Sequence, residues 1–303
     1  MESLASPYRP LTKDQAILIL KSVSTECGEL LSMIEKRKGW LAFPSPDMTD
    51  AIRNLRVHNY PLLYESEQLL ASVQIQGLFS PEGFQSLVAD FDATEGQERT
   101  ELLEAIIFVV SETMDAIHWP RTLEEKRAAQ AAFDALPPEK QKEATKQAQY
   151  FVASTMASFH QTLSVMVHSE RLTSLVARAK NGDADAFMKA VQIDTRILEE
   201  VPYFRERHHR ALDGGESEFL RRLGAVRSRP PYRGRIQHKA VYWGFSILQD
   251  LKLLEELKHR EILDVFDKSG MNLAANRIED VPYLTKRLGE FKRLQKTGVV
   301  SMS

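Results

Sequence analysis

The stretch that decides the fold is residues 138–169, PEKQKEATKQAQYFVASTMASFHQTLSVMVHS, which contains no glycine and no proline after its first residue. Both residue types interrupt helices, so this composition predicts one continuous helix, about 45 Å long at 1.5 Å per residue. Pro137 and Pro138 mark its start. Tyr150, Phe151 and Phe159 indicate its buried side. We expect this helix to connect the two halves of the chain.

Outward from this helix, the sequence consists of apolar runs with helical spacing, separated by short polar, glycine or proline segments. Thr12 with Gln15, and Thr122 with Glu125, have the spacing of capping boxes at helix starts. Further helices are predicted over residues 11–38, 49–57, 62–76, 81–91, 99–119, 122–136, 236–257, 258–268 and 282–295. We therefore predict an all-α fold, a multi-helix bundle with no significant β-sheet.

Charge divides the 303-residue chain unevenly. Residues 1–201 hold 20 Lys or Arg against 29 Asp or Glu, a balance of 20 − 29 = −9, which leaves 20 − 13 = +7 for residues 202–303. We predict an acidic amino-terminal helical bundle (1–136), a long connecting helix (137–169) and a basic carboxy-terminal helical domain (170–303). A basic half can bind a polyanion or the acidic half of the same chain.

Composition also narrows the cellular setting. The single cysteine, Cys27, excludes an internal disulfide and a cysteine-based zinc site. The longest purely apolar run, residues 105–110, is far shorter than the roughly 20 residues that cross a bilayer. The first 14 residues lack the pattern of a signal peptide. We expect a cytoplasmic protein without membrane contact.

Residues 172–191 and 204–223 align with an offset of 204 − 172 = 32 residues. Four identities support the alignment: Arg178, Ala179, Gly182 and Phe187 recur as Arg210, Ala211, Gly214 and Phe219. Each copy predicts two helices joined by a tight turn at the glycine, with Asp183 or Glu216 at the start of the second helix. Such hairpins stack on one another, so the carboxy-terminal half is predicted to be built on stacked hairpins that resemble a short α-solenoid. The alternative is a coincidence between two amphipathic hairpins.

The second copy is basic where the first is apolar, because Arg207 and His208 replace Leu175 and Val176. It continues into an arginine-rich loop, residues 225–239. Arginine guanidinium groups bind phosphate or carboxylate oxygens two at a time. We predict one basic binding surface formed by Arg207, Arg210, Arg221, Arg222, Arg227, Arg229, Tyr232, Arg233, Arg235 and Lys239.

Evidence for catalysis is weak in the sequence. Glu112, Asp115 and His118 follow one another at intervals of three and could hold a metal only if another helix supplied further ligands. His160 and His168 lie on the long helix without an adjacent partner of ligand type other than Glu170. We interpret both sets as ordinary polar side chains, because no metal-binding spacing accompanies them. We predict neither a metal nor another cofactor.

The function predicted from these features is non-catalytic: a helical binding or adaptor protein whose basic carboxy-terminal surface engages a protein partner. The first alternative is a nucleic-acid-binding protein, with arginines on phosphates and Tyr232 stacked on a base. The second is an enzyme whose site is assembled from distant helices, with Glu112, Asp115 and His118 as its candidates. The sequence leaves the identity of the partner and the oligomeric state open.

Overall fold

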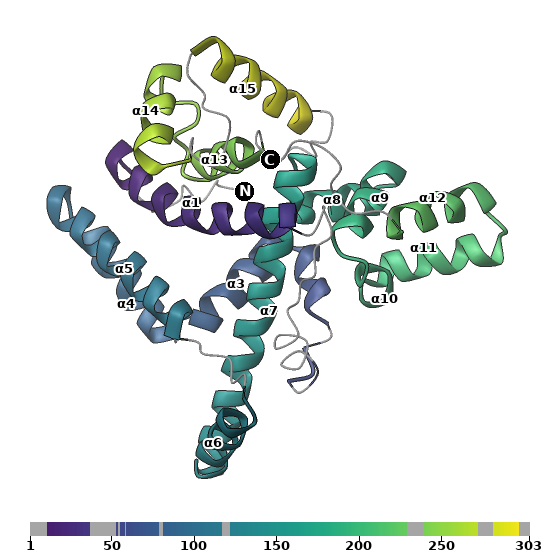
Figure 1. The fold of residues 1–303 in the computed structure, drawn as a ribbon, viewed down its shortest axis with the longest axis horizontal. Coiled ribbons are helices and arrows are strands. Elements are labelled where there is room, and N and C mark those ends of the chain that lie inside the picture. The colour runs from purple at the N-terminus through teal and green to yellow at the C-terminus, as the bar shows by residue number, and fades with distance from the viewer. Residues whose placement is uncertain are drawn as a thin grey trace, which may run out of the picture. The chain divides into compact units, whose positions relative to one another are not determined.

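The structure is a computed structural model that describes residues 11–36, 53, 55–57, 59–78, 81–116, 122–228, 239–271 and 281–296. Every regular element within these ranges is a helix, and no strand occurs among them (Figure 1). The predicted all-α fold is therefore confirmed. The predicted helix over residues 49–57 lies mostly outside the described ranges.

Contacts within the chain group it into two compact units, each assembled from segments far apart in sequence. The first unit contains residues 1–32, 81–115 and 235–293, and the second contains residues 33–80, 116–234 and 294–303. This grouping differs from the three consecutive parts expected from charge and composition, because helices distant in sequence pack together. The division into residues 1–136, 137–169 and 170–303 as separate domains remains a prediction.

The first unit contains most of α1 (Lys13–Lys36) and α15 (Val281–Lys296), together with α4 (Pro81–Ala93), α5 (Gly96–Ala116), α13 (Lys239–Asp250) and α14 (His259–Ser269). At the start of α1, the backbone N–H of Gln15 donates to Thr12 Oγ1 at 3.3 Å. The Gln15 side chain in turn accepts from the Thr12 backbone N–H at 3.1 Å. This reciprocal pair is the predicted capping box.

The core of the first unit is built on phenylalanines. The ring centroids of Phe245 and Phe266 lie 5.4 Å apart, and those of Phe245 and Phe291 lie 5.5 Å apart. Gly244 permits this packing, since a Cβ atom at that position would lie 2.8 Å from Phe266 Cζ. The helix α14 then ends at Gly270, whose φ of +77° suits a residue without a side chain.

The second unit holds the candidate site. Its elements are the 3₁₀ helix η1 (Tyr60–Glu65), α3 (Glu67–Leu78), α6 (Leu123–Asp134), α7 (Pro138–His168), α8 (Leu172–Lys180), α9 (Ala184–Ile193), α10 (Ile197–Glu200), α11 (Pro202–Asp213) and α12 (Ser217–Arg227). The helix α7 contacts α3, η1, α8 and α9. It is therefore the element around which the unit is built.

The predicted long helix is confirmed as α7. It begins directly after Pro137, and its carboxy-terminal cap Ser169 adopts a left-handed φ of +59°. From Val152 onward many of its side chains are buried, whereas none is buried between Pro138 and Phe151. The helix α6, which precedes it, starts with the predicted capping box of Thr122 and Glu125 and has no buried residue along its described length.

The single helix predicted over residues 62–76 is wrong. The chain forms η1 first, takes an extended conformation at Ser66 with φ of −154° and ψ of 128°, and then starts α3 at Glu67. The Leu69 backbone N–H donates to Ser66 Oγ at 3.3 Å, so Ser66 acts as a cap for α3. The break leaves Tyr60 and Tyr64 on their own short element.

Among the described helices, none combines the length and the apolar character that crossing a bilayer demands.

Candidate binding surface

The α8–α9 hairpin is joined by a turn whose conformation the local sequence explains. The helix α8 ends at Asn181, and Gly182 takes a φ of +93°, a left-handed conformation that glycine adopts without steric cost. Asp183 then caps α9, accepting hydrogen bonds from the backbone N–H groups of Asp185 at 2.9 Å and Ala186 at 3.0 Å. The predicted role of Asp183 at the helix start is confirmed.

The α11–α12 hairpin has the same turn conformation. The Glu216 backbone N–H donates to the Ala211 carbonyl at 2.9 Å, as the Asp183 N–H donates to the Arg178 carbonyl at 3.1 Å. The left-handed glycine is Gly215, with φ of +64°, whereas Gly214 is right-handed with φ of −82°. The turns therefore correspond with an offset of 33 residues, not 32, and assigning the turn position to Gly214 was wrong. The internal repeat stays a prediction.

The two hairpins differ in burial. The helices α8 and α9 bury eleven residues between them, whereas α11 and α12 bury only Phe204, Ala211 and Leu223. We call these three the hairpin anchors. The ring of Phe204 stacks on that of Phe187 in α9 with centroids 4.4 Å apart. The remaining described residues of α11 and α12 are exposed or partly exposed, so this hairpin presents most of its surface to solvent.

Arg207 does not extend freely from this surface. Its guanidinium donates to both carboxylate oxygens of Glu216, at 3.0 and 2.6 Å, and lies 4.1 Å from the centre of the Phe219 ring. The hydrogen bond from Arg207 lowers the pKa of Glu216 below its ordinary value. Arg207, which the 32-residue alignment set against Leu175 and the shared turn sets against Ser174, is therefore held in an ion pair within the second hairpin.

Arg221 and Arg222 on α12 are also paired with carboxylates. The Arg221 guanidinium donates to Glu218 at 2.9 and 2.8 Å, and Arg222 Nη2 donates to Asp185 Oδ1 of α9 at 2.5 Å. Arg210 and Arg227 are exposed and form no ion pair within 4 Å of a described carboxylate, although the charge of Arg210 also helps to lower the pKa of Glu216. The surface consequently carries charges of both signs.

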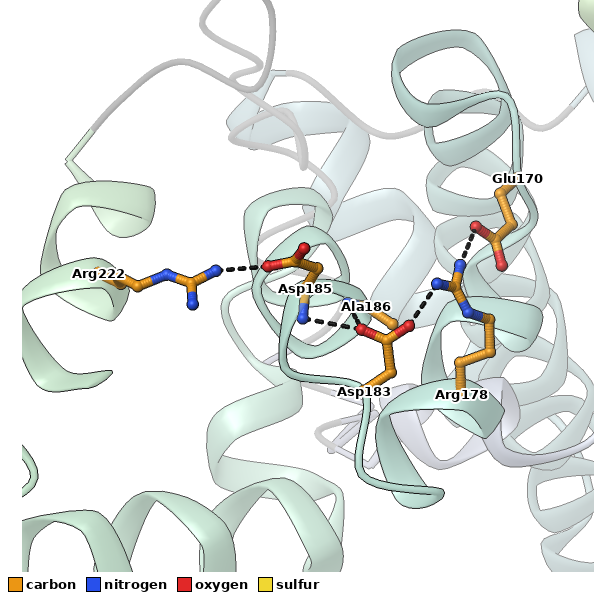
Figure 2. A network of polar contacts seen from close by, with 6 residues as sticks. All are labelled: Glu170, Arg178, Asp183, Asp185, Ala186 and Arg222. Carbon is orange, nitrogen blue, oxygen red and sulfur yellow. Dashed lines mark hydrogen bonds and ion pairs between the residues drawn. The ribbon is translucent and has the colours of Figure 1, made fainter. Parts of the chain in front are cut away.

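The Arg222–Asp185 pair belongs to a longer polar network, which Figure 2 shows from Glu170 across to Arg222. Arg178 of α8 donates to Glu170 Oε2 at 2.7 Å and, through its other terminal nitrogen, to Asp183 Oδ2. Asp183 accepts the N–H of Asp185, whose side chain receives Arg222. One arginine thus links the end of α7 to the cap of α9, and a second links α9 to α12.

Burial and hydrogen bonding act in opposite directions on the pKa values of Glu170 and Asp183 in this network. Burial raises the pKa of Glu170 above its ordinary value, against the lowering effect of Arg178. Partial burial also acts to raise the pKa of Asp183, but the hydrogen bonds from the Ala186 N–H and from Arg178 outweigh it, so that pKa is lowered. Asp183 is therefore the more firmly ionised of the two carboxylates.

The predicted basic surface is only partly described. Arg207, Arg210, Arg221, Arg222 and Arg227 lie together on the second hairpin. Arg229, Tyr232, Arg233 and Arg235 lie outside the described residues, and Lys239 begins α13 of the first unit. Glu112 and Asp115 fall within the backbone of α5, but their side chains and His118 are not described. Among the described side chains, no group of three His, Cys, Asp or Glu residues could hold a metal ion.

Sequence reasoning missed a second group of polar side chains, which surrounds His160 inside the second unit. Tyr60 and Tyr64 of η1 and Asp194, directly after α9, meet His160 of α7, and all four residues are buried. His160 is a buried histidine that is hydrogen-bonded to Tyr64. This is compatible with its interpretation from the sequence as an ordinary polar side chain. The two tyrosines in the sequence YPLLY were the available signal, since buried phenols take hydrogen-bond partners.

Comparison of this chain with protein-family models, with curated proteins and with solved structures finds no match. Its function is therefore inferred from the exposed α11–α12 hairpin and from the buried cluster around His160.

Proposed function

We propose that this chain is a non-catalytic binding protein that engages a protein partner through the hairpin surface. We define this surface as the exposed and partly exposed side chains of α11 and α12, which include Arg207, Arg210, Arg221, Arg222 and Arg227. The observation that carries the proposal is the contrast in burial within one unit. Two helices totalling 23 residues, 12 and 11, are held by only three buried side chains. Such a surface remains available to another molecule.

The charge pattern of this hairpin favours a protein over a nucleic acid. Residues 202–228 hold six arginines and four acidic residues, a balance of 6 − 4 = +2. Three of the arginines are already paired with carboxylates at 3.0 Å or less. A phosphate backbone would approach those carboxylates as like charges, whereas a protein partner can present complementary charges of both signs. An acidic or mixed-charge protein surface therefore fits best.

Arg210 and Arg227 indicate which side chains the proposed partner would present to this surface. Both are exposed arginines that form no ion pair within 4 Å of a described carboxylate. Arginine is enriched in protein interfaces and forms two parallel hydrogen bonds with a carboxylate. The proposed partner would supply Asp or Glu side chains opposite these two positions.

The proposal is tested with the double variant R221E/R222E, which reverses two exposed charges on α12. The tagged full chain is used to capture its partner from lysate, and the affinity of the purified pair is then measured by calorimetry. We expect a loss of at least about tenfold in affinity, because reversed charges would face the acidic groups of the partner. The matched control is K140E/K142E, which makes the same charge change at exposed positions of α7.

Two results would contradict the proposal. The first is a wild-type chain that captures no protein, and the second is a captured partner whose affinity is the same for R221E/R222E and the control. A gel shift with DNA or RNA that weakens steeply with salt and disappears on alanine substitution of Arg227, Arg229, Arg233 and Arg235 would favour the nucleic-acid alternative instead.

A further inference from the structure

The buried cluster around His160, which we call the tyrosine–histidine cluster (Tyr60, Tyr64, His160 and Asp194), joins three separate elements. Tyr64 Oη lies 2.8 Å from His160 Nδ1 and 3.0 Å from Asp194 Oδ2. Tyr60 Oη lies 2.9 Å from the same Asp194 oxygen. Each of the four residues is at most 5% exposed. The cluster therefore attaches η1 to α7 and to the segment after α9, and its polar groups are shielded from solvent.

Counting protons assigns the direction of these hydrogen bonds. The other Asp194 oxygen accepts the backbone N–H of Arg196 at 3.0 Å, and Oδ2 is shared by the two phenols. Each phenol has a single proton, so Tyr64 cannot donate to Asp194 and to His160 together. If Tyr64 donates to Asp194, the Nδ1 atom of His160 must carry a proton and donate to Tyr64 Oη. The closed arrangement thus requires a proton on His160 Nδ1, which the Nδ1–H tautomer of the neutral ring supplies.

The groups that face His160 disfavour a second proton on its ring. Burial is the main cause that lowers the pKa of His160; Asp194 opposes this effect and Arg196 adds to it. Asp194 Oδ2 lies 3.4 Å from His160 Nδ1 but already accepts two phenol protons. Burial also raises the pKa of both Tyr60 and Tyr64, so the phenols keep their protons at neutral pH. The guanidinium of Arg196 lies 5.0 Å from the centre of the Tyr60 ring.

We infer that the tyrosine–histidine cluster is a pH-sensitive lock, which holds η1 on α7 while His160 is neutral and releases it when His160 is protonated. An imidazolium would place a second cation beside Arg196 in a site that is closed to solvent. Opening of η1 would relieve this cost, since the ring and the phenols would then reach water. This inference is independent of the hairpin surface.

The direction in which the pKa of His160 is shifted decides how the stability of the closed form depends on pH. The pKa of His160 is lowered in the folded protein, whereas an exposed histidine titrates near pH 6.5. The open form therefore binds a proton more readily, and the stabilising effect is present above that pH and is lost as pH falls. Between the two pKa values, the ratio of closed to open forms falls by up to about tenfold per pH unit.

The lock is tested by hydrogen exchange of the full chain, with protection of residues 59–66 measured from pH 7.5 to pH 5 and corrected for the intrinsic pH dependence of exchange. We expect protection to fall by up to about tenfold per pH unit in the wild type. In H160N, the amide nitrogen can replace the Nδ1 donor but does not titrate, so protection should stay constant. H209N makes the same substitution at an exposed position and should keep the wild-type profile.

Retention of the wild-type pH dependence in H160N would overturn the inference, as would wild-type protection that does not change with pH. If H160N fails to fold, the ring protons of His160 in the wild type are titrated by NMR instead. An apparent pKa below that of an exposed histidine supports the lock. A value at or above it contradicts the lock.

Discussion

The two hairpins of the second unit share a turn and differ in almost everything that follows from burial. Both turns use a left-handed glycine, Gly182 or Gly215, followed by an acidic residue at the start of the next helix. Yet α8 and α9 contact α7 and bury eleven residues between them, whereas α11 and α12 bury only three. The turn thus sets the connection between the helices, and the apolar residues decide whether a hairpin becomes core or surface.

The difference lies in a few substitutions along the first helix of each pair. Leu175 and Val176 of α8 are buried, while His208 and His209, which the 33-residue offset of the turns places at the equivalent positions of α11, are partly exposed and exposed. A charged group is costly to bury without a full set of partners, so Arg207 remains near solvent and pairs with Glu216. The helix α11 consequently turns little of its surface inward.

The largest expected effect comes from removing the aromatic anchor of the second hairpin. Phe204→Ala should lower the free energy of unfolding by about 3–5 kcal/mol, because the ring is fully buried and stacks on Phe187. Urea denaturation measures the loss, and hydrogen exchange should show residues 202–227 deprotected first. Phe219→Ala serves as the control and should cost less, since Phe219 is partly exposed. Equal losses for the two variants would mean that Phe204 is no special anchor.

A smaller effect on the free energy of unfolding is expected from the residues at the starts of α9 and α12. Asp183→Ala removes a cap that accepts two backbone N–H groups and should cost about 1 kcal/mol. Glu216 makes no such bond with the start of α12, and its ion pair with Arg207 is exposed to screening by solvent, so Glu216→Ala should cost less than Asp183→Ala. Both are measured by urea denaturation at neutral pH. A larger loss from Glu216→Ala than from Asp183→Ala would reverse the contrast between the hairpins.

The smallest effect concerns the ion pair that links the hairpins. A double-mutant cycle with Asp185→Asn and Arg222→Gln should give a coupling energy of at most about 1 kcal/mol, since both side chains are substantially exposed. The coupling should also disappear at about 1 M salt, where the screening length is only about 3 Å. A coupling that persists in high salt would indicate that the pair is shielded and orients the second hairpin.

Local sequence signals predicted much of the fold. The caps at Thr12, Thr122 and Asp183 and the proline start of α7 depend on neighbouring residues, which the sequence displays directly. The tyrosine–histidine cluster depends on contacts across 96 and 130 residues, and no local pattern specifies those. The pairing of Arg222 with Asp185 likewise follows from how α12 meets α9. Charge counting alone therefore overstated how freely the arginines are presented.

The exposed helix α6 has a practical consequence. None of its residues is buried, and its start is stabilised by its own capping box. Its outer positions can therefore carry a fluorophore, a spin label or a short affinity tag without disturbing the core. A label on α6 would lie in the same unit as the hairpin surface but outside the residues proposed to bind a partner. It would therefore report on partner binding while leaving the proposed contact residues unmodified.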